Sequence, residues 1–413
     1  MGTLVRRTSA LMKMRRKDAP VGGLVKSFSF QLPTRIEFGN GVSQTVGDEA
    51  KSLGGSRALV VTDPGIEAAG LVEPVLGRLS DAGLSTIVFD DVAPNPRDTS
   101  VAAGAQVAIS EGCDVLVAVG GGSPMDTAKA IGVIATHGGV IQDYEGLGLV
   151  QKPITPLVAI PTTAGTGSEV TFWSVITDTA RSFKMSVGSP LCAATVALVD
   201  PELTTGLPAG ITAYTGVDAL THAVEGYTST LSEPLTDSLA VSAIRLISGS
   251  LRQAYANGAN LDARYDMMLA SLLAGVAFGN SDIAGVHCMG EAIGGLYDTP
   301  HGVAMAIYLP VVAEFTYIAV PEKFAIVAEA LGEDVTGLSV LEAARRAPSA
   351  IRKLTDDLGI PSASAVGVRR EDFPRLAQAA SVNVSVESNA RVAKEQDFLA
   401  MFEAAQAVGV ANL

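Results

Sequence analysis

The chain has 413 residues, of which 48% are hydrophobic and 17% charged, so it can bury a large core and is long enough for two domains. Its net charge of −14 argues against a nucleic-acid partner, because affinity for phosphates rests on cationic side chains. The sequence has no run of about 18 apolar residues that would predict a membrane span, and its three cysteines, without paired spacing, indicate free thiols in a reducing, cytoplasmic compartment.

The first 26 residues differ from the rest, because seven lysines and arginines accompany a single acid, Asp18. They lack the apolar segment of a secretory signal. A disordered basic leader, a transit peptide and a misassigned start codon all have this composition, so residues 1–26 are set apart from the fold.

Residues 27–207 alternate short apolar runs with helical stretches such as Glu73–Ala82 and Ser100–Ser110. Continuous apolar runs are typical of strands buried on both faces of a parallel sheet. These runs are Ala58–Thr62, Thr86–Phe89, Val115–Val119, Leu157–Ile160 and Val196–Val199. The alternation predicts a Rossmann-like α/β domain with a doubly wound sheet.

Two strand pairs are expected beside these runs. The sequence predicts one strand pair within Phe28–Phe38. It also predicts an antiparallel hairpin, attached to the sheet, from Phe172–Asp178 and Lys184–Val187. Phe172, Trp173 and Phe278 are candidate walls of an apolar substrate pocket, or simply core residues.

Helical spacing replaces the strand pattern near Thr205–Gly210. The helical segments are Ile211–Tyr227, Leu235–Tyr255, Ala263–Phe278 and much of Lys323–Ala405. We therefore expect an all-helical second domain over residues 208–413.

A glycine cluster, Gly120–Gly122, separates the predicted strand Val115–Val119 from the helical stretch Thr127–Thr136. Such a turn exposes backbone N–H groups at a helix N-terminus, whose partial positive charge suits a pyrophosphate. Ser123 would act as donor or N-cap, and Pro124 would occupy the first helical position.

A second turn, Pro161–Glu169, is rich in hydroxyl groups and also follows an apolar strand. Two turns at the carboxyl ends of strands in one sheet would line a single crevice, where open α/β sheets bind their ligands. The alternative is a pair of tight turns without a ligand.

Asp63 ends another predicted strand, and two roles are compatible with its position. It either accepts a hydrogen bond from a ribose 2′-OH, which would favour NAD over NADP, or forms the turn before Pro64.

Three of the four histidines lie in the predicted helical domain. Asp218 and His222 share one helix face, His287 lies on a later helix, and His301 follows Pro300. One carboxylate and three imidazoles could hold Fe(II) or Zn(II) and leave a position for a substrate oxygen. Hydrogen-bonded core histidines are the alternative.

From about Phe28 onward the chain resembles the iron-containing (group III) alcohol dehydrogenase family. Several long motifs in the right order carry the resemblance. They are VTD ending at Asp63, PNP at Pro94–Pro96, GGGSPMDTAK at Gly120–Lys129, PTTAGTGSE at Pro161–Glu169, GVDALTHAVEGY at Gly216–Tyr227, and the stretch from Gly275 through GVHCMGEAIGGLYDTPHGVA.

The resemblance implies hydride transfer between NAD(H) and a primary or secondary alcohol or its carbonyl, at iron or another divalent metal in the cleft between the domains. It further implies a homodimer or larger homo-oligomer. The implied metal ligands are Asp218, His222, His287 and His301. The implied dinucleotide contacts are Asp63, Asn95, Gly121, Gly122, Ser123, Asp126, Thr162, Thr163, Thr166 and Lys184.

One residue departs from the family pattern. Four residues after His287, the best-known members carry a histidine near the nicotinamide, whereas this chain has Glu291. Sharing a helix face with His287, it should point toward the cleft and is, with His301, a candidate catalytic residue. It could accept the alcohol proton, hold a histidine, select a polar substrate, or be only a solvated acid.

Two other activities are compatible with such a fold. A lyase of the dehydroquinate synthase type would need a strongly basic pocket, and a metal-free reductase of the maleylacetate type would lack the full ligand set. The sequence favours the alcohol dehydrogenase over both.

Overall fold

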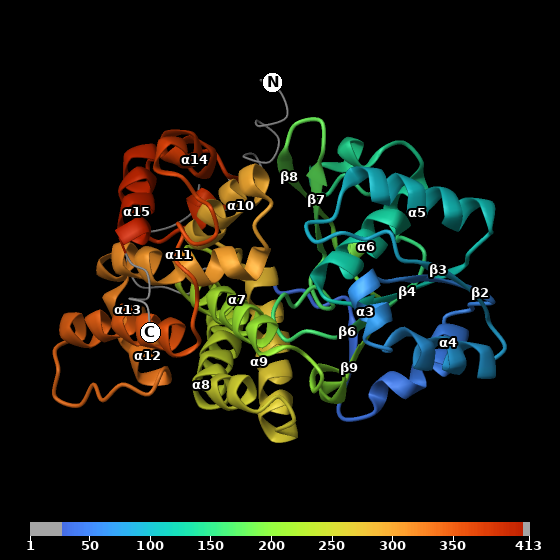
Figure 1. Ribbon diagram of the computed structural model, residues 1–413, viewed down its shortest axis with the longest axis horizontal. Helices are drawn as coiled ribbons and strands as arrows, with labels where there is room; N and C mark the ends of the chain where they lie inside the picture. The colour runs from blue at the N-terminus through green and yellow to red at the C-terminus, as the bar shows by residue number, and fades with distance from the viewer. Residues whose placement is uncertain (1–26, 408–413) are drawn as a thin grey trace.

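The computed structural model describes residues 27–407, so the basic leader lies outside the described residues. The N-terminal part is built on a six-stranded sheet in the order β1-β9-β6-β4-β2-β3, with every pairing parallel (Figure 1). The strands are β1 (Arg35–Phe38), β2 (Arg57–Val61), β3 (Ser85–Phe89), β4 (Val115–Gly120), β6 (Leu157–Pro161) and β9 (Val196–Val199). The five predicted strands are confirmed.

Helices cover both faces of this sheet. They are α2 (Val46–Ser52), α3 (Pro64–Ala68), α4 (Val72–Asp81), α5 (Asp98–Ser110) and α6 (Gly122–His137). Along β2, Leu59 and Val61 enter the hydrophobic cluster beneath α5 and α6, whereas Ala58 and Val60 enter the cluster beneath α2 and α4. Burial on both sides explains why the strand reads as an unbroken apolar run.

Two expectations about strands need correction. The hairpin of β7 (Trp173–Asp178) and β8 (Phe183–Gly188) forms, but it belongs to a separate three-stranded sheet with β5 (Gly146–Leu147). The expected strand pair in Phe28–Phe38 is wrong, since only β1 is a strand and its partner is β9. Pro33, which has no amide hydrogen to donate, precedes β1.

The C-terminal part is helical, as predicted. Its helices are α7 (Ala209–Thr228), α8 (Pro234–Ala256), α9 (Leu261–Ser281), α10 (Gly285–Tyr297), α11 (His301–Thr316), α12 (Pro321–Ala330), α13 (Val340–Asp357), α14 (Phe373–Ser381) and α15 (Glu395–Ala407). Short 3-10 turns join elements in both parts: η1 (Val42–Thr45), η2 (Ile141–Tyr144), η3 (Pro190–Cys192), η4 (Pro201–Thr204), η5 (Tyr317–Ala319), η6 (Arg370–Asp372) and η7 (Val384–Ser388).

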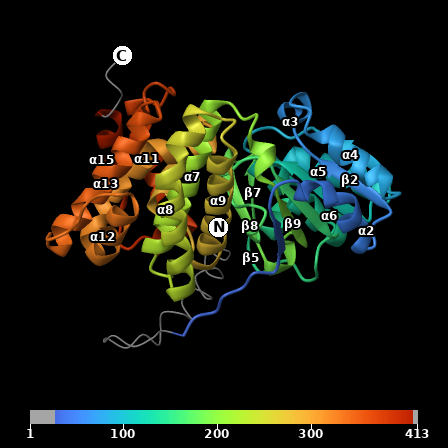
Figure 2. The same ribbon diagram turned by 90° about the horizontal axis from the view of Figure 1, so that it is seen from below.

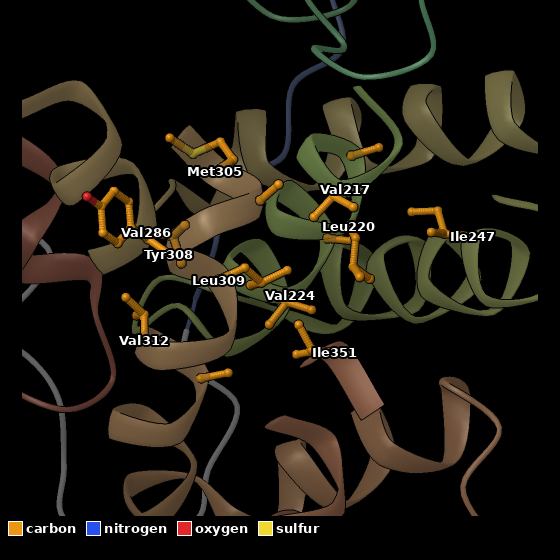
Figure 3. Close-up of a cluster of buried hydrophobic side chains, with 14 of the residues drawn as sticks. Val217, Leu220, Val224, Ile247, Val286, Met305, Tyr308, Leu309, Val312 and Ile351 are labelled. Carbon is orange, nitrogen blue, oxygen red and sulfur yellow. The ribbon is translucent and has the colours of Figure 1, made fainter. Parts of the chain in front are cut away.

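Helix α7 is the centre of the helical part and packs against α8 and α9 (Figure 2). Val217, Leu220 and Val224 of α7 lie in one buried cluster with Leu309 of α11 and Ile351 of α13 (Figure 3). A helix buried on most sides cannot tilt freely, so the polar side chains that α7 carries are held in fixed positions.

Helix α11 with η5 is long and apolar enough to cross a membrane by length and composition, but 72% of the tested window is buried within the protein. Among the described residues it is the one such unbroken helix, and its burial marks it as a core helix. The three cysteines, all in the described part, are free, as expected.

Candidate active site

The turns after β4 and β6 lie against each other, as the sequence predicts. A Cβ atom built on Gly121 would lie 3.2 Å from Oγ1 of Thr163, and one on Gly122 would lie 2.9 Å from Cγ2 of Thr166. Only glycine leaves room for this approach. The hydroxyls of Thr162 and Thr163 are buried without a hydrogen-bond partner among residues 27–407, so they are available to a bound molecule.

Helix α6 begins earlier than expected. Its N-cap is Gly121, which offers no side-chain bond, and Gly122 is the first helical residue. Ser123 is therefore not the N-cap, and Pro124 is the third helical residue rather than the first. Proline is tolerated there because the first-turn amides have no partner inside a helix. These amides remain free to bind an anion.

Two acids predicted to contact the dinucleotide have partners in the protein. Asp63 is the N-cap of α3, and its Oδ1 accepts from the amides of Gly65 and Ile66 at 2.9 and 3.1 Å. Asp126 accepts from the Ser168 hydroxyl at 2.6 Å and from the Val175 amide at 2.9 Å. The structure thus gives Asp63 the turn-forming role, and the contact of either acid with a cofactor stays a prediction.

A polar bridge joins the two parts beside these turns. The Lys184 ammonium donates to Oδ1 of Asn95 at 2.6 Å, and the Asn95 amide donates to Oδ1 of Asp298 at 2.9 Å. Arg97 binds the other oxygen of Asp298 at 3.0 Å. Asn95 and Asp298 both have left-handed backbone conformations, with φ of 55° and 54°. The bridge therefore fixes the loop that precedes His301.

The four predicted metal ligands come together from three helices. Asp218 and His222 lie on α7, His287 on α10, and His301 begins α11. One ligand atom from each lies within 4.8 Å of all the others. The Nε2 atoms of His222 and His287 are 3.1 Å apart, and Nε2 of His301 lies 3.6 Å from Oδ1 of Asp218.

Neighbouring groups orient the imidazoles toward one point. Nδ1 of His222 lies 3.2 Å from the carbonyl oxygen of Gly165, in the turn after β6, and Nδ1 of His287 lies 2.6 Å from the Glu225 carboxylate. Each contact places the proton on Nδ1 and directs the Nε2 lone pair into the cluster. Oδ1 of Asp218 is buried and has no hydrogen-bond partner in the described part of the chain, as expected of an oxygen that would bind a cation.

The electrostatics also suit a metal ion. Burial lowers the pKa of His222 and of His301 well below the ordinary value, so both rings stay neutral and able to ligate. Burial raises the pKa of Asp218 to about 7. Three nitrogen donors and one oxygen donor fit Fe(II) or Zn(II).

The cluster is closed on one side and open on another. The Phe278 ring stacks on the His222 ring at a centroid distance of 4.1 Å, so this candidate pocket wall covers a metal ligand. The His301 side chain keeps 31% of its surface exposed, whereas Asp218 is buried. Trp173 instead packs over Gly188 in the hairpin. The His301 side of the cluster is therefore more exposed than the Asp218 side.

The comparisons with known proteins agree with this geometry. Residues 33–201 match the family model of iron-containing alcohol dehydrogenases, and residues 212–406 match the model of the family's C-terminal region. The chain belongs to the iron-containing alcohol dehydrogenase family. This confirms the predicted family, fold class and enzyme class. The two matches meet where strands give way to helices.

Curated relatives of this alcohol dehydrogenase match over nearly their whole length. The 1,3-propanediol dehydrogenase of Klebsiella pneumoniae is 47% identical over 383 residues, which are 92% of this chain and 99% of the relative. The NAD-dependent methanol dehydrogenase of Bacillus methanolicus is 45% identical over 370 residues, 89% and 97% of the two chains. A solved 1,3-propanediol oxidoreductase superposes with a TM-score of 0.90 at 47% identity, covering 92% and 100%. Neither alternative activity finds support among these proteins.

Sequence reasoning missed three residues of this alcohol dehydrogenase's site. Glu225 orients His287, Asp298 holds Asn95, and Asn383 donates to Oε2 of Glu291 at 2.6 Å. The signal for Glu225 was present, since it lies three residues after His222 on the same helix face. Asn383 lies 92 residues from its partner, and no sequence pattern links them.

Proposed function

We propose that this enzyme transfers a hydride between NAD(H) and a small primary or secondary alcohol, or the corresponding aldehyde or ketone. The observation that carries the proposal is the cluster of Asp218, His222, His287 and His301, which opens on the side of His301. The names of the relatives, which include propanediol and methanol dehydrogenases, favour a short alcohol.

The protein side of the reaction follows from the residues present. When bound, a divalent ion supplies a Lewis acid that polarises the substrate oxygen, and NAD supplies the hydride acceptor. Asp218 and the three histidines would hold the ion, while Glu225 and the Gly165 carbonyl keep two rings aligned.

The proposed binding of NAD is supported by the two turns after β4 and β6, which lie against each other. The free amides at the start of α6 and the hydroxyls of Thr162 and Thr163 would bind the pyrophosphate and its surroundings. Gly121, Gly122 and Thr166 shape this crevice. Lys184 and Asn95 lie in the bridge between the two parts and would contact the nicotinamide half. Contacts by Ser123, Asp63 and Asp126 remain predictions.

Metal analysis combined with NADH oxidation across a panel of aldehydes tests the function. We expect about one Fe(II) or Zn(II) per chain and NADH oxidation with C2–C6 aldehydes. The variant Asp218→Asn should lose both the metal and the turnover. Turnover that persists without metal would instead support the metal-free reductase, and failure with every aldehyde would refute the proposal.

We also propose a domain division, a cellular location and an oligomeric state. We infer two domains, residues 27–207 and 208–413, because the strands end at β9 and helices follow from α7. A cytoplasmic location is supported by the three free cysteines. A homodimer or larger homo-oligomer rests on the family resemblance, and light scattering of the purified protein tests it.

A further inference from the structure

Glu291 lies on the face of α10 that points to the metal ligands. It follows His287 by four residues and therefore shares its helix face. One turn later, the Lys184 ammonium lies over Gly294, where an added Cβ would come within 3.0 Å of the nitrogen. A carboxylate thus stands between a metal ligand and a buried ammonium group.

Hydrogen bonds from a segment outside α10 hold the Glu291 carboxylate in place. The Asn383 side-chain amide donates to its Oε2 at 2.6 Å, and Oδ1 of Asn383 accepts from the Ser385 amide at 2.9 Å, which fixes the orientation of the Asn383 amide. The hydroxyls of Ser385 and Ser388 in turn donate to the carboxylate of Asp282, the residue that caps the end of α9. The position of Oε2 is therefore set by a rigid network.

The other oxygen of Glu291 is available. Within the described part of the chain, Oε1 receives no hydrogen bond, and the side chain is only half-buried. Among the described residues Glu291 makes no hydrogen bond to a histidine: Nδ1 of His287 is bound to Glu225 and Nδ1 of His222 to Gly165.

We propose that Glu291 is a specificity-determining residue whose free oxygen accepts a hydrogen bond from a donor on the far end of the alcohol substrate, a hydroxyl or an ammonium group. The inference rests on the proposed function. A site with an unmatched acceptor binds an analogue that lacks the donor poorly, because the acceptor loses water and gains no partner. The enzyme should therefore prefer diols or amino alcohols to plain alcohols of equal size.

Three alcohols of equal size form the test: 1-butanol, 1,3-propanediol and 3-amino-1-propanol, which end in a methyl, a hydroxyl and an ammonium group. Their dissociation constants are measured by calorimetry on the metal-loaded enzyme with NADH, a complex that cannot turn over an alcohol. The wild-type enzyme should bind one of the two donor-bearing alcohols at least about tenfold more tightly than 1-butanol. Steady-state oxidation with NAD should show the same ratio in kcat/KM.

Variants identify the residue and the donor. Glu291→Leu should abolish the preference and leave the affinity for 1-butanol intact. Glu291→Gln keeps an acceptor without the charge, so it should retain a preference for a hydroxyl and lose one for an ammonium group. Asn383→Ala should reduce the preference several-fold by freeing the carboxylate. Asp357→Asn is the control, because it removes a carboxylate that binds Arg252 outside the candidate site and should leave the ratio unchanged.

The outcomes separate the two proposals. An unchanged ratio in Glu291→Leu, or a wild-type enzyme without preference, would overturn the role of Glu291. An equal loss of kcat for all three alcohols in Glu291→Gln would point to proton transfer and overturn it as well. If Glu291→Leu does not fold, the wild-type ratio and Glu291→Gln still decide. A metal-loaded wild-type enzyme that turns over no alcohol would refute the proposed function itself.

Discussion

Nδ1 of His287 lies 2.6 Å from Oε2 of Glu225, a carboxylate on the same helix as Asp218 and His222. The same carboxylate accepts from the amides of Ala284 and Val286 at 2.9 and 2.6 Å. Glu225 therefore holds both the ring of a predicted metal ligand and the beginning of the helix that carries it. Two predicted ligands and the group that aligns a third come from α7, so this helix sets the relative positions of the residues in the site.

Glu225→Gln should weaken metal binding about 10- to 100-fold, because an amide no longer fixes the His287 ring as a carboxylate does. Competition with a chromogenic chelator measures the affinity directly. Asp237→Asn, which removes a carboxylate bound to Lys323 elsewhere in the helical part, is the control and should leave the affinity unchanged. Equal affinities in wild type and Glu225→Gln would contradict this role.

Gly122→Ala should weaken NADH binding about tenfold. The new methyl group would meet Cγ2 of Thr166 at 2.9 Å, so the two turns must separate where the pyrophosphate is expected. Fluorescence titration of NADH measures the effect. Gly77→Ala, at a helical glycine with open space around it, is the matched control and should bind NADH like the wild type. The double variant Gly122→Ala/Thr166→Ser, without the methyl group, should recover part of the loss.

Glu169→Gln should stabilise the protein more at pH 8 than at pH 5. Burial raises the pKa of Glu169 from 4.5 to about 7, so between these values the unfolded chain loses a proton that the folded chain keeps. The contribution of this group to the free energy of unfolding is complete below pH 4.5 and is lost as the pH rises through 7. The free energy of unfolding falls by about 3 kcal/mol over this range.

Urea unfolding at pH 5 and at pH 8 measures the difference in the free energy of unfolding between Glu169→Gln and the wild type. Glu342→Gln is the control, since hydrogen bonds from Ser339 lower the pKa of Glu342 and the stability linked to its charge is already present at pH 5, so its effect should be nearly the same at both pH values. A Glu169→Gln effect that is equal at both pH values would show that Glu169 ionises normally.

Chelation of the metal should lower the midpoint of thermal unfolding by several degrees. Metal-free protein keeps Oδ1 of Asp218 buried without a partner, which costs about 1–3 kcal/mol. In metal-free protein, Asp218→Asn should therefore unfold at a higher temperature than the wild type, while it gains nothing from added metal. Calorimetry with and without Fe(II) or Zn(II) tests both statements, and a variant that responds to metal like the wild type would contradict them.

Strands, helices and the placement of Asp218 and His222 on one helix face could be predicted because each is encoded locally. Buried parallel strands such as β4 read as unbroken apolar runs, and Asp218 and His222 are one helical turn apart. The start of α6 was missed because Gly121 caps the helix without a side chain. The partners Asn383 and Asp298 could not be predicted, since hydrogen bonds between distant segments depend on tertiary packing and leave no periodic signal.

The bridge from Asn95 to Asp298 ends three residues before His301. Only Thr299 and Pro300 separate the two, and proline restricts the freedom of that short segment. Through these two residues, the polar contact between the α/β and helical parts is connected along the backbone directly to His301.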